Sequence, residues 1–133
     1  MRFYRCNICG NEIEMILDSG NAPFCCGRVM EEIRPNETDG AKEKHVPVCK
    51  LCKGDLSCPD IKKVWVMVGA EPHPMTAEHK ISWIIVETDR HIYRKNLAAG
   101  QEAAAVFYMH SDEKVQRVYS YCNLHGLWMA DCK

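Results

Sequence analysis

The residues with the clearest chemical potential lie near the end of the chain, in the stretch from Tyr119 to Trp128. Cys122 and His125 are three positions apart, after an alternating, strand-like run and directly before Gly126. Cysteine thiolates and histidine imidazoles bind transition metals well. A Cys-x-x-His pair at a strand end can direct both side chains at one ion. The same pair would also fit a buried cysteine beside a hydrogen-bonded histidine.

Four more cysteines form two pairs within residues 1–36, namely Cys6, Cys9, Cys25 and Cys26. The first pair has the Cys-x-x-Cys spacing that lets two thiolates reach one metal. The second pair is adjacent, so its side chains diverge and can bind one ion only in a distorted geometry. Four thiolates suit zinc or iron, and such a short segment needs a metal because it cannot bury a stable core. Structural zinc without a redox role is the alternative.

Three further histidines occupy predicted loops or strand ends: His45, His73 and His79. Prolines flank His73 on both sides, which excludes a helix and stiffens the loop. With Cys122 and His125 these histidines would supply four imidazoles and one thiolate. Five donors exceed the four of structural zinc and suit a metal with octahedral preference and one vacant position, such as iron(II).

Two charged residues, Glu43 and Lys44, directly precede His45. Such a charge pair is usually only a solvated loop, but beside a metal it would stand at the mouth of the site. The other histidines, His91 and His110, are interpreted as surface residues.

The elements that must position these residues are strands. After a short strand at 12–17, the pattern predicts strands following His45 and at 63–68, 82–87, 91–95, 103–109 and 115–122. The segment 103–109 also fits a helix, and its aromatic and β-branched end favours a strand. In the last strand Val115, Arg117, Tyr119 and Tyr121 are expected on one face. Six or seven short strands with regular turn signals indicate an all-β sandwich.

Composition sets the remaining bounds. The chain has 133 residues with a formal net charge of -1, which does not indicate a nucleic-acid partner. It contains no apolar run long enough for a membrane span and begins without a signal-peptide core, so we expect a cytoplasmic protein. Nine cysteines in a reducing compartment favour metal ligation over a disulfide framework. A polar, turn-rich segment near residue 37 predicts domains 1–36 and 37–133.

Four cysteines lie outside the candidate ligand sets: Cys49, Cys52, Cys58 and Cys132. For the first three, ordinary loop thiols are the preferred interpretation, followed by a reversible disulfide between Cys49 and Cys52, and then by another metal site. Ligation of either predicted metal by Cys49, Cys52 or Cys58 is not expected, because an added thiolate would block the vacant position.

Several separated motifs resemble desulfoferrodoxin, the two-iron superoxide reductase family, and they occur in the family's order over nearly the whole chain. These motifs are Cys6-x-x-Cys9 with Cys25-Cys26, Glu43-Lys44-His45-Val46-Pro47, Pro72-His73-Pro74-Met75, Glu78-His79 and Cys122-Asn123-Leu124-His125-Gly126. The resemblance implies a desulforedoxin-like module followed by an immunoglobulin-like seven-stranded sandwich, in a homodimer. It also implies that the four cysteines hold one iron, and that four equatorial histidines and axial Cys122 hold a second.

The implied activity is the one-electron reduction of superoxide to hydrogen peroxide. Lys44 would steer the anion and help to deliver protons, and Glu43 would cover the oxidised iron afterwards. Because the sequence has no flavin or nicotinamide motif, an external donor such as a rubredoxin-like protein is expected. The rival hypotheses are a non-enzymatic electron carrier or metal-binding protein that uses only the four cysteines, and a dismutase, which would also oxidise superoxide.

Overall fold

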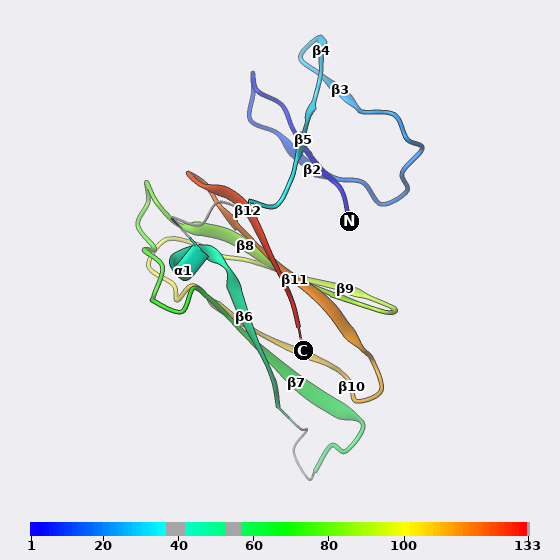
Figure 1. Cartoon of the computed structure of the whole chain (residues 1–133), viewed down its shortest axis with the longest axis vertical. Coiled ribbons are helices and arrows are strands. Elements are labelled where there is room, and N and C mark those ends of the chain that lie inside the picture. Colours follow the sequence, from blue (N-terminus) through cyan, green and yellow to red (C-terminus); the bar gives the residue numbers. More distant parts are fainter. Residues whose placement is uncertain (37–41, 53–56, 133) are drawn as a thin grey trace. The chain divides into compact units, whose positions relative to one another are not determined.

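The computed structural model describes residues 1–36, 42–52 and 57–132. The chain divides into two compact units, Met1–Pro35 and Asn36–Lys133. Each unit is built almost wholly from strands (Figure 1). None of the helices in the described ranges is long and apolar enough to cross a membrane.

The first unit is a small β structure around a minimal core. Strands β1 (Phe3–Arg5), β2 (Glu12–Glu14) and β5 (Glu31–Ile33) form an antiparallel sheet in the order β2-β1-β5. Strands β3 (Phe24–Cys25) and β4 (Arg28–Val29) form a separate hairpin. Only Tyr4, Cys6 and Met30 are buried in its core cluster. The strand predicted over 12–17 is shorter than expected, because Ile16 and Leu17 lie beyond it and are exposed.

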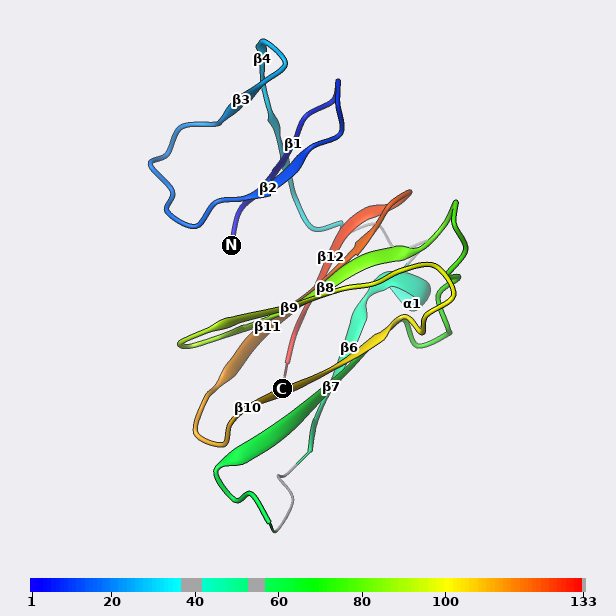
Figure 2. The same cartoon turned by 180° about the vertical axis from the view of Figure 1, so that it is seen from behind.

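The second unit is an all-β sandwich of two antiparallel sheets, as the sequence predicts (Figure 2). In its described part seven strands follow the short helix α1 (Lys42–His45). These strands are β6 (Pro47–Cys52), β7 (Ile61–Val68), β8 (Ile81–Thr88), β9 (Ile92–Asn96), β10 (Ala104–His110), β11 (Val115–Cys122) and β12 (Gly126–Asp131). One sheet has the order β10-β7-β6 and the other β12-β11-β8-β9. The ambiguous segment is therefore strand β10, while β12 is a strand that the sequence pattern did not predict.

The core lies between the two sheets. Alternating residues of β7, among them Val64, Val66 and Val68, are fully buried there. Strand β11 departs from simple alternation, because its pairing with β8 shifts register between Val115 and Arg117. Val115 consequently packs against the core cluster that contains Val118. The predicted common face holds for Arg117, Tyr119 and Tyr121, whose pairing with β8 is regular. It is wrong for Val115, because a bulge inserts an extra residue there and changes its face.

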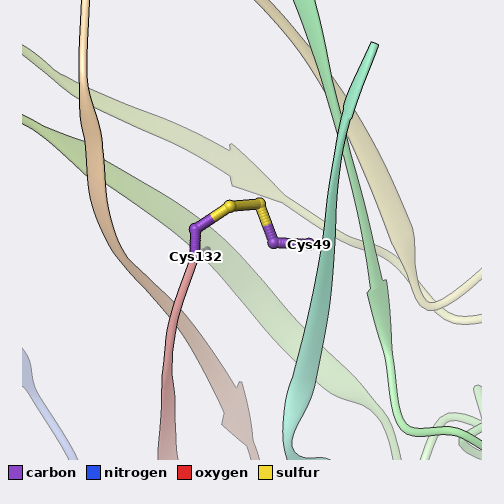
Figure 3. Close-up of a disulfide and its surroundings, with 2 residues drawn as sticks. All are labelled: Cys49 and Cys132. Atoms are coloured by element: carbon purple, nitrogen blue, oxygen red, sulfur yellow. A yellow bond between two sulfur atoms is a disulfide. The ribbon is translucent and has the colours of Figure 1, made fainter.

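A disulfide between Cys49 and Cys132 joins the edges of the two sheets (Figure 3). Cys49 belongs to the edge strand β6, and Cys132 follows the edge strand β12 of the other sheet. The Cys49–Cys132 bond overturns the preferred interpretation of Cys49 as an ordinary thiol. The alternative bond between Cys49 and Cys52 is wrong as well, because both residues lie in one extended strand. Residues three apart in a strand face opposite sides and lie roughly 10 Å apart. Cys52 and Cys58 are free and exposed, which fits ordinary thiols.

Candidate metal centres

The four cysteines of the first unit converge on one point. One sulfur from each of Cys6, Cys9, Cys25 and Cys26 lies within 4.8 Å of the others. The backbone N–H groups of Cys9 and Ile8 point at the sulfur of Cys6 and lower its pKa to about 6, although burial opposes this shift. A thiolate, not a thiol, ligates a metal. The Cys6-x-x-Cys9 segment is therefore suited to a cation before one is bound.

The adjacent pair reaches the same point through unusual backbone geometry. Cys26 has a φ of 50° and Gly27 has a φ of 74°, so both occupy the left-handed region. This turn brings the sulfurs of Cys25 and Cys26 within 3.9 Å of each other. Left-handed backbone is costly for a residue with a side chain, and such strain collects at functional sites. The left-handed turn therefore lets the side chains of Cys25 and Cys26, which would otherwise diverge, reach the same point.

A second cluster lies at one end of the sandwich. Its five members each offer one donor atom, all within 4.8 Å of one another: His45, His73, His79, Cys122 and His125. His45 Nε2 lies 3.0 Å from His125 Nδ1, which in turn lies 3.5 Å from the sulfur of Cys122. The donors come from α1, the β7–β8 loop, the end of β11 and the β11–β12 turn. Residues separated by 80 positions thus share one site.

The hydrogen bonds of His73 prepare it to bind a cation. Its Nδ1–H donates to the carbonyl of Pro74 over 2.6 Å, which leaves the lone pair on Nε2. The Nε2 atoms of His73 and His79 are buried and have no hydrogen-bond partner among the described residues. A buried nitrogen without a partner is costly, and a metal ion would supply the missing interaction. The donor set and these two orphaned atoms fit a transition metal.

The electrostatics of this cluster favour neutral imidazoles. Burial lowers the pKa of His73 to about 4, and the neighbouring imidazoles of His45, His79 and His125 act in the same direction. Burial also lowers the pKa of His79, with help from His125 and from the positive charge of Lys44. Neutral imidazole is the form that ligates a metal. Because the charge of Lys44 lowers the pKa of His79, its electrostatic field extends to the five-donor cluster.

Two contacts with the sandwich hold His45 in place. Its ring stacks on Trp128, with centroids 5.0 Å apart and an interplanar angle of 19°. The hydroxyl of Ser120, buried on β11, donates to its backbone carbonyl over 2.9 Å. Trp128 belongs to the buried core, whereas Trp65 lines an apolar cavity of about 390 Å³ next to His73.

Gly69 is a functional position that the sequence pattern did not single out. Its φ is 85°, and a Cβ there would lie 2.6 Å from the carbonyl oxygen of Lys44. The N–H groups of Gly69 and Ala70 donate to the carbonyls of Val46 and Glu43. Only glycine allows this close approach between α1 and the loop that carries His73. Its place between a strand and the Pro-His-Pro motif was the available signal. Glu43 and Lys44 are exposed in α1.

The sequence pattern also did not indicate the roles of Asn36 and Glu113. Asn36 Nδ2 donates to the carbonyl of His125 over 2.5 Å and so supports the β11–β12 turn. Glu113 is a fully buried carboxylate away from the donor clusters, where Thr88 and Tyr93 each donate to it over 2.9 Å. His91 is exposed, as expected, but its Nδ1 lies 3.2 Å from this carboxylate.

The fold and the two clusters define a class: an all-β metalloprotein with a four-thiolate centre and a separate centre of four imidazoles and one thiolate. The family model for desulfoferrodoxin matches residues 37–131, and that for the desulfoferrodoxin N-terminal domain matches residues 1–33. The chain belongs to the desulfoferrodoxin family. Neither donor cluster in the described ranges includes Cys49, Cys52 or Cys58.

Individual relatives agree with this assignment. A desulfoferrodoxin homolog of Archaeoglobus fulgidus is 39% identical over 130 residues, covering 98% of this chain and 96% of the relative. The desulfoferrodoxin of Desulfarculus baarsii is 37% identical over 131 residues, covering 98% and 96%. Among solved structures, the superoxide reductase of Treponema pallidum superimposes with a TM-score of 0.76 at 30% identity, covering 97% of this chain and 95% of that one.

Proposed function

We propose that the chain is a superoxide reductase. It reduces superoxide by one electron and, with two protons, forms hydrogen peroxide. The observation that carries this proposal is the convergence of His45, His73, His79, Cys122 and His125 within 4.8 Å. Membership of the family and the similarity to the T. pallidum superoxide reductase support it. Removal of superoxide gives the protein a role in defence against oxidative stress.

Two mononuclear iron ions are the proposed cofactors. Cys6, Cys9, Cys25 and Cys26 would hold the first, and the five-donor cluster the second. When bound, an iron ion with four imidazoles and one thiolate supplies a redox-active Lewis acid with one position left for substrate. The protein holds the imidazoles neutral through burial, as His73 illustrates. The N–H···O bond to Pro74 keeps the binding nitrogen of His73 free of a proton.

The positive charge of Lys44 beside the five-donor cluster is the second contribution of the protein. Lys44 is exposed, and its charge lowers the pKa of His79, so its field acts where the anionic substrate must arrive. A cation in this position raises the encounter rate of an anion and can pass protons from its Nζ through water. Glu43, one residue earlier, repels the anion if it acts during encounter. Its proposed role is to cover the cluster after the product has left.

The proposed electron donor is a small external protein of the rubredoxin type. A homodimer is the proposed assembly, supported by large apolar side chains on the first unit, because Ile16 is 90% and Leu17 88% exposed. The cytoplasm is the proposed location, supported by the five cysteines of the donor clusters, which must stay reduced to bind a metal.

Measurements of metal content, visible spectrum and superoxide turnover test the function together. Iron should be present at two atoms per chain, and iron–thiolate charge transfer should colour the oxidised protein. Superoxide should then be consumed only as fast as a reductant is supplied, with peroxide formed and no oxygen released. Release of oxygen without a reductant would identify a dismutase. A colourless zinc protein that is inactive after loading with iron would refute the proposal.

A further inference from the structure

Asn123 follows Cys122 and begins the turn that carries His125, and its side chain bonds to a loop distant in sequence. Its Nδ2 donates to the carbonyl of Glu78 over 2.8 Å, and its Oδ1 accepts from the N–H of Lys80 over 2.9 Å. These two bonds bracket His79 on both sides. A third bond runs from the backbone N–H of Asn123 to the carbonyl of Lys80 over 3.1 Å.

The position of these bonds follows from the sheet. The ladder between β8 and β11 ends at the pair Ile81–Cys122, after a shift of register at Tyr121. A carboxamide carries one acceptor and one donor group, as a peptide unit does. The side chain of Asn123 therefore extends the pairing beyond the last regular pair, to the residues on either side of His79.

His79 depends on this support more than His73, the other histidine of its loop. His73 is 5% exposed and fixed by packing and by Pro74, whereas His79 is only half-buried. The turn around His79 is closed locally by Thr76, whose N–H donates to the carbonyl of His79 and whose hydroxyl accepts from its N–H. Local closure shapes the turn but does not set its distance from β11, which holds Cys122.

We propose that Asn123 is a positioning residue for the five-donor centre: its carboxamide sets the imidazole of His79 against the thiolate of Cys122. This inference rests on the proposed metal-binding role of that cluster. Partners that orient metal ligands typically contribute 10- to 100-fold to metal affinity. Removing the carboxamide of Asn123 should therefore weaken metal binding at the five-donor centre and leave metal binding at the four-cysteine centre unchanged.

The test is a Co²⁺ titration of the full chain against a competing chelator. The two centres are distinguished by their visible spectra, because tetrahedral tetrathiolate Co²⁺ differs from Co²⁺ bound by imidazoles and one thiolate. Asn123→Ala removes both side-chain bonds. Asn123→Asp is nearly isosteric and keeps the acceptor for Lys80, but places an oxygen against the carbonyl of Glu78. Leu124→Ala is the matched control, since Leu124 is the next residue and 61% exposed.

Both Asn123 variants should bind Co²⁺ about 10-fold more weakly at the five-donor centre, with a shifted spectrum there. The four-cysteine centre and the Leu124→Ala variant should match the parent. Unchanged affinity and spectrum in both variants would overturn the inference, as would equal weakening of the two centres, which would indicate general destabilisation. If the parent binds Co²⁺ only at the four-cysteine centre, the proposed function fails as well, so the two failures are distinguishable.

Discussion

The bond between Cys49 and Cys132 should contribute several kcal/mol to the stability of the second unit. It closes a loop with a sequence separation of 83 between the edge strands of two sheets. In the chain-entropy model a loop of this length stabilises by about 4.5 kcal/mol at 25 °C, and measured values for disulfides are typically about 2–4 kcal/mol. For a unit of this size each kcal/mol shifts the unfolding midpoint by roughly 4–8 °C. With about 2–4 kcal/mol, breaking the bond should lower the midpoint by about 8–32 °C.

The assay is thermal unfolding followed by near-ultraviolet circular dichroism, with and without a phosphine reductant. Cys132→Ser should unfold at the same temperature as the reduced parent, and reductant should not change it further. Cys58→Ser is the control, because Cys58 is exposed and free, and it should behave as the parent does. Equal midpoints for the oxidised parent, the reduced parent and Cys132→Ser would refute the reasoning. A drop in Cys52→Ser in place of Cys132→Ser would restore the pairing within β6.

Three further outcomes are expected. Lys44→Ala should slow the reaction with superoxide by up to roughly 10-fold at low salt and flatten its dependence on ionic strength, which pulse radiolysis measures. Cys9→Ser should lose iron from the first centre yet keep most superoxide reduction, whereas His125→Ala should lose it; equal losses would contradict separable sites. Burial opposes ionisation of Glu113, but the hydrogen bonds from Tyr93 and Thr88 lower its pKa to about 2, below its ordinary 4.5. Its contribution to stability is present at neutral pH and lost as the pH falls from about 4.5 to 2, so acid unfolding of Glu113→Gln should depend less on pH in this range.

Coordination chemistry and local pattern made much of this protein predictable. Local sequence is enough to predict that Cys6 and Cys9 can bind one metal, because of their spacing. It is also enough to predict a stiff loop at His73, because prolines flank that residue on both sides. Local sequence pattern likewise predicted most strands. For β10 the signal was the aromatic and β-branched end of the segment, since such residues favour strands. These are short-range properties. For the same reason the pattern could not decide how far the strand that begins at Glu12 extends.

What only the tertiary structure decided are the contacts between segments far apart in the chain. Local propensity carries no information about which edge of one sheet meets which edge of the other, so the partner of Cys49 could not be deduced. The hydrogen bonds of buried Glu113 and those of the Asn123 side chain also depend on strand register and sheet packing, as the partner of Cys49 does. Gly69 must be glycine because its φ is positive and because a Cβ there would meet the carbonyl of Lys44 in α1. The sequence by itself determined which donors are available, and the packing of the two sheets decided what holds them in place.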